Sequence, residues 1–232
     1  MAKKAVILVG GLGTRLRPVT YETPKPLLTV KKKPIVTHLI DLFRRYGVEQ
    51  IALLANADHR PDFEQWRKSR PEDSQGVEFF FEDKPRGTFG GLKELRNWIG
   101  NESFFLSNGD ELKDFNLGIL RDFHSGHDGV GTLALVAVDK PQEYGVPVME
   151  NNRISEFLEK PANPPSNLVS AGFYLLNPGI FDFADFNQEF IMIEKDVFPK
   201  AARAGRLFGL PLEGRWFDCG TLERWEKAIK EW

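Results

Sequence analysis

The 232-residue sequence predicts an α/β protein, and two observations support this fold class. Short apolar runs alternate along the chain with amphipathic stretches, which is the pattern of a sheet with helices on its faces. In addition, a glycine-rich segment over residues 10–28 follows directly after the first apolar run, residues 5–9. We therefore expect this segment at the carboxyl end of a strand, where open α/β sheets bind ligands.

The apolar runs predict strands and the amphipathic stretches predict helices. A helix is expected over residues 34–46, because proline stands in its first turn, apolar residues recur from Ile35 to Phe43, and Gly47 provides a stop. Further helices are expected over residues 88–99, 114–124 and 222–232. The expected strands comprise residues 5–9, 50–55, 77–82, 103–107, 130–138, 153–159 and 168–176.

The glycine-rich segment has the residue types that bind phosphate groups. Gly10, Gly11 and Gly13 lack a Cβ atom, so the chain can turn with positive φ and bring backbone N–H groups against phosphate oxygens. Arg15 can direct two donors to one phosphate, and Lys25 can add a positive charge from the far side of the loop. The segment therefore predicts a loop that binds a triphosphate.

Other glycine-rich motifs fit this segment poorly. Pro18, Pro24 and Pro26 restrict the backbone and disfavour a continuous helix. A dinucleotide-binding turn continues into a helix directly after its third glycine, and a P-loop ends in Gly-Lys-Ser/Thr; this segment does neither. A plain surface turn would explain the glycines alone, but not the basic residues at this spacing.

The loop resembles the signature of the sugar-1-phosphate nucleotidyltransferases, written approximately as GGxGTRLxPxTxxxPKPLxxV. Every fixed letter of that signature is present between Gly10 and Val30. Later segments are similar to family motifs in the same order, at residues 87–91, 107–110, 143–146, 159–161, 171–174 and 216–221. Six ordered matches make the resemblance much more specific than one loop.

This resemblance implies a Rossmann-like nucleotide-diphospho-sugar transferase fold, with a mixed central sheet, helices on both faces and no C-terminal β-helix. We expect one domain over residues 1–232. Within it, about residues 1–110 would form the nucleotide-binding half and about residues 111–232 the sugar-phosphate-binding half. The implied reaction transfers a nucleotidyl group from a nucleoside triphosphate to a sugar-1-phosphate and releases pyrophosphate.

Composition is consistent with a compact cytoplasmic enzyme. The 41% of hydrophobic residues can bury a substantial core, and the net charge of −2 gives no general attraction to nucleic acid or anionic membranes. The lone Cys219 excludes an intrachain disulfide and suits a reducing compartment. No apolar run is long enough for a signal-peptide core or a membrane span. We expect small-molecule substrates and no nucleic-acid or membrane partner, with the oligomeric state open between monomer and dimer.

Two aspartates are candidate metal ligands. Asp110 follows an apolar strand, so its carboxylate should emerge at the carboxyl edge close to the glycine loop, and Asp218 could approach the same point. Two carboxylates with phosphate oxygens and water suit Mg²⁺, and both residues match the family's metal-binding positions. Glu111 is a possible third ligand, although an exposed neighbour is the simpler interpretation.

The resemblance also implies roles for individual residues. Arg15 and Lys25 would be catalytic, because they would stabilise negative charge on the triphosphate and the leaving pyrophosphate. The expected nucleotide-binding residues are Leu8, Gly10, Gly11, Gly13, Thr14, Arg15, Glu82, Gly87, Thr88 and Asn108. The expected sugar-phosphate-binding residues are Gly145, Glu159, Lys160 and Tyr174. Adjacent Glu159 and Lys160 would point to opposite faces in a regular strand, but a strand end before Pro161 could relax this.

The nucleotide base is less well determined. Guanine presents two adjacent donors that a carboxylate such as Glu82 can accept, so we favour GTP with mannose-1-phosphate or a related sugar phosphate. UTP, dTTP or CTP, with glucose-1-phosphate or N-acetylmuramate-1-phosphate, remain alternatives. Phe89 stands where many family members have alanine and could reshape the base pocket.

Other functional classes remain open. A catalytically silent regulatory homologue would bind a nucleotide-sugar without turnover, but Arg15, Lys25, Asp110 and Asp218 are all intact. A glycosyltransferase would need an Asp-x-Asp pair, which is not evident around Asp110, and molybdopterin nucleotidyltransferases lack the Pro-Lys-Pro of this loop. The run at residues 79–81, Phe-Phe-Phe, could stack nucleic-acid bases, but no basic residues interleave it and a buried strand explains it better.

Overall fold

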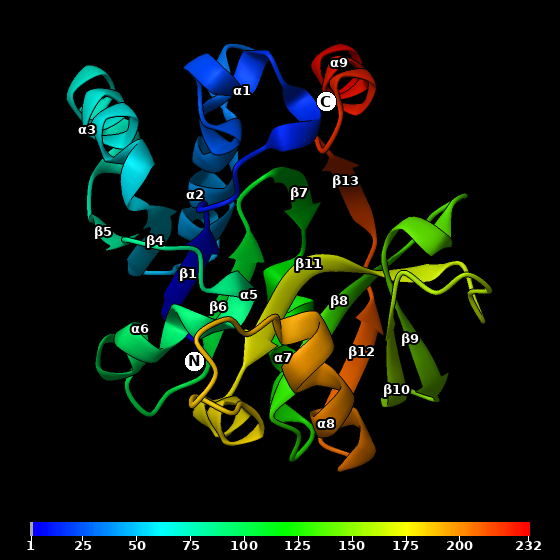
Figure 1. Ribbon diagram of the computed structural model, residues 1–232. Helices are drawn as coiled ribbons and strands as arrows, with labels where there is room; N and C mark the ends of the chain where they lie inside the picture. The colour runs from blue at the N-terminus through cyan, green and yellow to red at the C-terminus, as the bar shows by residue number, and fades with distance from the viewer. Residues whose placement is uncertain (1) are drawn as a thin grey trace. The chain divides into compact units, whose positions relative to one another are not determined.

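A computed structural model describes residues 2–232, which form two compact units (Figure 1). The glycine-loop unit comprises residues 3–85, 107–115 and 214–232. The central unit comprises Ala2 with residues 86–106 and 116–213. Both units are therefore assembled from segments that are distant in the sequence.

A parallel sheet forms the core of the glycine-loop unit. Its strands are β1 (Lys4–Leu8), β4 (Gln50–Asn56) and β5 (Val77–Glu82), in the order β5-β4-β1. Residues 5–7 of β1 and residues 51–56 of β4 are buried, as expected for parallel strands covered on both faces. The three predicted strands are confirmed, with boundaries that differ by at most one residue.

Helices cover this sheet. The predicted helix at residues 34–46 is α2 (Ile35–Arg45), whose buried side includes Leu39 and Phe43. The other helical segments between β4 and β5 are η3 (Ala57–His59), α3 (Arg60–Ser69) and α4 (Pro71–Ser74). Phe79 and Phe81 are half-buried rather than buried, and the guanidinium groups of Arg67 and Arg60 lie 5.7 and 4.0 Å from their ring centroids. The Phe-Phe-Phe run contains no basic residue, but two arginines of α3 pack against its rings.

The glycine-rich segment forms only short elements, as its prolines predict. These are η1 (Thr14–Leu16), α1 (Val19–Glu22), η2 (Lys25–Leu27) and a small ladder of β2 (Thr29–Val30) with β3 (Lys33–Pro34). The chain stays in the loop conformation that the phosphate-binding hypothesis requires.

A two-stranded ribbon in this unit was not predicted. Strand β7 (Glu111–Phe115) pairs antiparallel with β13 (Gly214–Asp218), and α9 (Leu222–Glu231) follows β13. Leu112 and Phe217 lie opposite each other in this ladder and both belong to an apolar cluster that includes Leu16. The ribbon is therefore anchored on one face by hydrophobic packing.

The expected helix at residues 114–124 was wrong at its start. Asp114 belongs to β7, and the helix α7 (Leu117–Ser125) begins after Asn116. The Asn116 Oδ1 atom accepts hydrogen bonds from the Gly118 and Ile119 backbone N–H groups at 2.9 and 3.4 Å. Asn116 is thus the N-cap that separates strand from helix.

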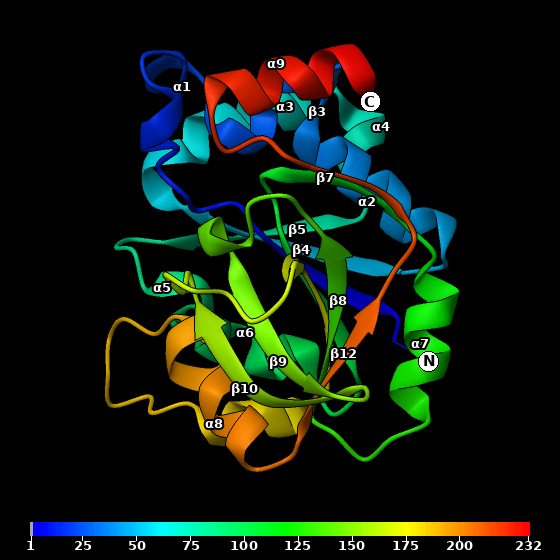
Figure 2. The same cartoon turned by 90° about the vertical axis from the view of Figure 1, so that its right-hand side faces the viewer.

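The central unit contains a mixed sheet in the order β11-β8-β12-β10-β9. Figure 2 labels four of its strands, β8, β9, β10 and β12. Strand β12 is parallel to β8, whereas the β11–β8, β10–β12 and β10–β9 pairs are antiparallel. The strands are β8 (Gly131–Ala137), β9 (Gly145–Glu150), β10 (Arg153–Glu159), β11 (Leu168–Leu176) and β12 (Leu207–Pro211). The expected α/β class and mixed sheet are confirmed, but β9 and β12 were not predicted.

The remaining elements are mostly helical. Strand β6 (Phe104–Asn108) contains the point at which the chain passes from the central unit to the glycine-loop unit. The expected helix at residues 88–99 is divided at Gly91 into α5 and α6. The helical segments of the central unit are α5 (Gly87–Gly90), α6 (Leu92–Ile99), α7, η4 (Pro141–Glu143), η5 (Pro178–Phe183), η6 (Ile193–Val197) and α8 (Phe198–Arg203).

Within residues 2–232, no helix has the length and apolarity that crossing a bilayer requires.

Candidate active site

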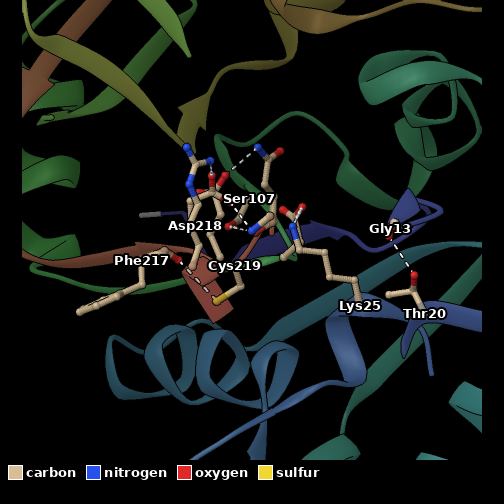
Figure 3. Close-up of polar contacts among 12 residues, drawn as sticks. Gly13, Thr20, Lys25, Ser107, Phe217, Asp218 and Cys219 are labelled. Atoms are coloured by element: carbon tan, nitrogen blue, oxygen red, sulfur yellow. Dashed lines mark hydrogen bonds and ion pairs between the residues drawn. The ribbon is translucent and has the colours of Figure 1, made fainter. Parts of the chain in front are cut away.

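The glycine loop is shaped by close backbone contacts after β1. Gly13 adopts a φ of +60°, and a Cβ atom there would lie 2.9 Å from Thr20 Cγ2. The Thr20 hydroxyl donates to the Gly13 carbonyl at 2.8 Å, which closes the turn (Figure 3). At Gly11, by contrast, a Cβ atom would have no neighbour within 4 Å. Gly13 is therefore required by the turn, whereas Gly11 leaves open space beside the loop.

Arg15 and Lys25 differ strongly in exposure. The Arg15 side chain, from η1, is exposed, whereas the Lys25 side chain is only 6% exposed. The Lys25 Nζ atom donates to Asp110 Oδ2 at 2.6 Å. Desolvation alone would raise the pKa of Asp110, but the charge and hydrogen bond of Lys25 outweigh it and lower the pKa below its usual value. The structure thus joins two of the predicted residues into one ion pair.

The antiparallel register of β7 and β13 brings two more carboxylates together. Asp218 lies directly opposite Glu111, so both side chains share one face of the ribbon. Asp218 Oδ1 accepts from the Gly220 backbone N–H at 2.6 Å, and Asp218 Oδ2 accepts from Arg224. A Cβ atom on Gly220 would lie 3.1 Å from the Arg15 guanidinium, so Arg15 also approaches this point.

Glu111 is not the exposed neighbour that the sequence suggested. Its side chain is 12% exposed, and Oε2 accepts from the Trp216 indole N–H at 2.9 Å. Burial raises the pKa of Glu111, and the nearby Asp110 and Asp218 carboxylates raise it further, whereas Lys113 opposes the shift. A carboxylate-rich cluster therefore lies beside the glycine loop within one unit.

The donor set fits a divalent cation with an open coordination sphere. Among residues 2–232, no group of three or more His, Cys, Asp and Glu side chains is arranged to hold a metal ion. Asp110 and Asp218 offer carboxylate oxygens, which Mg²⁺ prefers, and Mg²⁺ commonly takes its other ligands from water and substrate phosphates. The residues present thus fit Mg²⁺ that is bound together with a triphosphate.

The predicted nucleotide-binding residues of this unit lie at strand ends around the loop. Glu82 ends β5 and is 7% exposed, and a Cβ atom on Gly10 would lie 3.8 Å from its Oε2. The Leu8 carbonyl accepts from the Gly109 N–H at 2.9 Å, and the Asn108 amide donates to Glu111 Oε1 at 3.4 Å. Thr14 begins η1 and is exposed.

Gly87 and Thr88 lie in the central unit. Gly87 has a φ of +79°, and a Cβ atom there would lie 2.3 Å from the Ile191 carbonyl oxygen. The Thr88 hydroxyl donates to Glu194 Oε2 at 2.6 Å and accepts from the Ile193 N–H at 2.9 Å. Burial raises the pKa of Glu194. Glu194 was not among the predicted site residues.

The neighbouring Glu159 and Lys160 converge because the strand ends between them. Strand β10 ends at Glu159, and Lys160 adopts a left-handed φ of +51°. The Lys160 Nζ atom lies 3.6 Å from Glu159 Oε1. A Cβ atom on Gly145, which pairs with Glu159, would lie 2.4 Å from the Phe157 ring and 3.2 Å from Glu159 Oε2. The expected relaxation of strand geometry before Pro161 is therefore present.

Two aromatic residues of the sequence analysis are packing residues. Tyr174 is 1% exposed, its ring lies 5.0 Å from that of Phe198, and its hydroxyl accepts from Ser170 at 3.4 Å. Phe89 is fully buried, with its ring 5.3 Å from that of Phe181. These contacts favour structural roles for both side chains.

Sequence reasoning missed three polar residues around the carboxylates. They are Lys113, Trp216 and Arg224, which contact Glu111, Glu111 and Asp218 respectively. Trp216 lies in a family-like segment, but its spacing gives no indication of the hydrogen bond to Glu111. Lys113 carries no signal at all, because a lysine in a mixed polar segment normally lies at the surface.

A glycine loop after a parallel strand, with a lysine and carboxylates beside it, is typical of α/β proteins that bind nucleoside phosphates. The chain belongs to the nucleotidyl transferase family, which matches it over residues 4–232.

Named relatives agree with this assignment. The chain is 39% identical over 224 residues to a mannose-1-phosphate guanyltransferase from Kluyveromyces lactis, with 94% of this chain and 61% of the relative covered. It is 37% identical over 228 residues to mannose-1-phosphate guanylyltransferase 1 from Arabidopsis thaliana, with the same coverage. The chain therefore spans about three fifths of the length of these relatives.

A solved structure shares the fold. It is a putative glucose-1-phosphate thymidylyltransferase from Bacillus anthracis in complex with a sucrose, with a TM-score of 0.89 and 25% sequence identity. The match covers 98% of this chain and 94% of that protein. The similarity therefore extends over both units of the chain.

Proposed function

We propose that the protein transfers a nucleotidyl group from a nucleoside triphosphate to a sugar-1-phosphate. A sugar-phosphate oxygen attacks the α-phosphorus and forms a new P–O bond, while the bond between the α-phosphorus and the β-phosphate bridging oxygen breaks. The products are a nucleoside-diphospho-sugar and pyrophosphate. The Lys25–Asp110 ion pair beside the glycine loop is the observation that supports this proposal most strongly.

Positioning and charge neutralisation would provide the catalysis, because the attacking phosphate is already ionised at neutral pH. Arg15 is exposed beside the glycine loop, where it can bind the β- and γ-phosphates. Lys25 would stabilise charge near the α-phosphate. No protein nucleophile is required, and burial raises the pKa of the nearby Cys219 thiol to about 12, which keeps it protonated.

Asp110 and Asp218 would hold Mg²⁺ as the cofactor. When bound, the ion supplies positive charge to the phosphate oxygens of the triphosphate. In its absence, Lys25 and Arg224 neutralise the two carboxylates.

We propose GTP and mannose-1-phosphate, or a related sugar phosphate, as the preferred substrates. The names of the two curated relatives support this choice, and the buried Glu82 carboxylate at the end of β5 could accept the two adjacent donors of guanine. A UTP-, dTTP- or CTP-dependent enzyme is the alternative. Leu8, Gly10, Gly11, Gly13, Thr14, Gly87, Thr88 and Asn108 would contribute to nucleotide binding.

Lys160 and Glu159 would bind the sugar phosphate. The Lys160 side chain is 59% exposed and can pair with a phosphate. The Glu159 side chain is 15% exposed and can accept hydrogen bonds from sugar hydroxyl groups. A side chain at position 145 would clash with the Phe157 ring and crowd the Glu159 carboxylate, so Gly145 is needed to keep Glu159 in place. Tyr174 would act through packing.

Pyrophosphate release tests the proposal. The assay combines Mg²⁺ with GTP, UTP, dTTP, CTP or ATP and with mannose-, glucose-, N-acetylglucosamine-, heptose- or N-acetylmuramate-1-phosphate. Release with one pair, lost in Asp110→Asn, would support the proposal and identify the substrates. No release with any pair, but retained nucleotide-sugar binding by calorimetry, would indicate a regulatory homologue instead.

A further inference from the structure

Lys113 is a fully buried lysine within the carboxylate cluster. Its side chain is 0% exposed, and Nζ lies 3.1 Å from Glu111 Oε2. Nζ also donates to the Ser107 hydroxyl and to the Asn108 carbonyl, both at 3.1 Å. Burial of an ammonium group is costly unless it is paired and hydrogen-bonded. These contacts therefore offset the cost of burying the Lys113 ammonium group and fix its position.

The geometry of the ribbon explains why a cation is needed there. Glu111 and Lys113 are two residues apart on β7, so their side chains share a face. Asp218 and Trp216 of β13 lie opposite them on that face. Like charges directly opposite each other destabilise an antiparallel ladder. Lys113 thus offsets the repulsion between the facing Glu111 and Asp218.

Lys113 differs from the two cations that pair with Asp110 and Asp218. Lys25 pairs with Asp110, whose side chain is 39% exposed, and Arg224 pairs with Asp218 while being 26% exposed itself. Each of those pairs thus has one partner that reaches the surface. Lys113 has no exposed surface and is bonded to three acceptors, so it cannot leave Glu111 without disrupting the loop that precedes Asp110.

We propose that Lys113 is a fixed counter-ion of Glu111, so that Asp110 and Asp218, and not Glu111, coordinate a divalent cation. Lys113 is thus a positioning residue that selects which carboxylates of the cluster bind the ion. The inference rests on the proposed function for its biological meaning. Its physical content, the distribution of charge in the cluster, can be measured without any reaction.

The test is Mn²⁺ binding to the nucleotide-free protein, measured as loss of the free-ion electron paramagnetic resonance signal up to millimolar Mn²⁺. Lys113→Met removes the charge with little change in shape. We expect Mn²⁺ affinity to rise on the order of 10-fold or more, because an uncompensated Glu111 carboxylate then attracts the ion. Lys113→Met/Glu111→Gln removes both charges and should return the affinity to that of the unmodified protein.

Lys33→Met is the matched control. Lys33 forms an ion pair of 2.6 Å with Asp41 on the same unit, but both side chains are about two-fifths exposed. This variant should bind Mn²⁺ like the unmodified protein. A purely structural role for Lys113 predicts unchanged or weaker binding in Lys113→Met, which is the opposite sign.

Each outcome is decisive. If Lys113→Met fails to fold but the double variant folds, the Mn²⁺ affinity of the double variant decides: affinity equal to that of the unmodified protein supports the proposal, because Glu111 is then not a ligand, and weaker binding overturns it. If the double variant also fails to fold, or if folded Lys113→Met binds Mn²⁺ no more tightly than the unmodified protein, the proposal is overturned. Failure of the proposed function would appear differently, as an unmodified protein that binds Mn²⁺ but releases no pyrophosphate.

Discussion

The Lys25 ammonium group lies 2.6 Å from Asp110 Oδ2, although 85 residues separate the two in the sequence. Lys25 comes from η2 in the glycine-rich segment, and Asp110 precedes β7. Lys25 is buried while Asp110 is partly exposed, so the lysine holds the carboxylate at the edge of the site. The pair links the proposed triphosphate loop to the proposed cation site.

Lys25→Met and Asp110→Asn should each lower kcat by about 10²-fold to 10³-fold, because each removes charge that acts on the transferred phosphate. Since the two groups act together, the double variant should lose much less than the product of the two effects. Steady-state pyrophosphate release measures all three variants. Losses that multiply would show that the two residues work independently.

Arg15→Ala should reduce turnover by a similar factor while leaving stability nearly unchanged. The side chain is exposed and comes from a short helical turn, so its removal costs little folding free energy. Arg15→Lys should recover only part of the activity, because an ammonium group cannot reproduce a bidentate guanidinium contact. Kinetics and thermal unfolding should be measured together, and near-normal kcat/KM in Arg15→Ala would contradict the role.

Strands were predicted best where the apolar runs of the sequence are continuous. Strands β5, β10 and β11 were predicted with the boundaries observed. Strand β7 was missed because the polar residues in its sequence, Glu-Leu-Lys-Asp-Phe, interrupt the apolar run that indicates a strand. Its polar side chains join the carboxylate cluster only through the pairing of β7 with β13. Strand propensity is a local property and does not indicate a pairing strand that lies about 100 residues away in the sequence.

The same limit applies to the candidate site. The glycine loop, Arg15 and Lys25 are adjacent in one motif, and the motif indicates phosphate binding directly. The opposition of Glu111 and Asp218 depends on strand register, which no local pattern determines. The burial of Lys113 depends in turn on that opposition. Long-range pairing therefore decides which charged residues belong to the site.

Two glycines of the site should respond differently to alanine. A Cβ atom on Gly109 would lie 2.6 Å from Val9 Cγ1 and 2.7 Å from the Leu8 carbonyl oxygen. Gly109→Ala should therefore lower the free energy of unfolding by about 1–3 kcal/mol. Gly11→Ala has no such contact and should change stability by less than about 0.5 kcal/mol, while raising KM for the nucleotide. Urea titrations and kinetics check both; equal stability losses would contradict the distinction.

Glu82→Gln should change the preference among nucleotides. Glu82 ends β5 beside Gly10 and is buried. A carboxylate accepts both adjacent donors of guanine, whereas an amide also donates and suits a base with neighbouring donor and acceptor groups. We expect kcat/KM for GTP to fall relative to UTP and dTTP. An unchanged ratio would remove Glu82 from base recognition.

Two histidines of the central unit form a directed hydrogen-bond network. The Gly129 N–H donates to His127 Nδ1 at 3.0 Å, so His127 Nε2 carries the proton and donates to Thr132 Oγ1 at 2.8 Å. The Thr132 hydroxyl can then donate to His124 Nδ1 at 2.8 Å, and His124 Nε2 donates to Asn177 Oδ1 at 3.0 Å. Each contact is satisfied when both histidines are neutral.

This network predicts a loss of stability in acid. Burial, together with the neighbouring His124, lowers the pKa of His127 from 6.5 to about 4. The unfolded chain therefore binds more protons between these pH values, so the free energy of unfolding should fall as the pH drops from about 6.5 to about 4. Below that range His127 is protonated in both states and its contribution no longer changes.

His127→Phe should flatten this dependence, because phenylalanine keeps the stack on Phe208, whose ring centroid lies 3.9 Å away, but cannot bind a proton. Urea unfolding at several pH values gives the slope for each variant. His59→Gln is the control, since His59 belongs to the other unit and lies outside the network. If His127→Phe keeps the slope of the unmodified protein, the acid sensitivity must come from other groups. The substitution removes the one imidazole at this position that binds a proton more readily in the unfolded chain than in the folded protein.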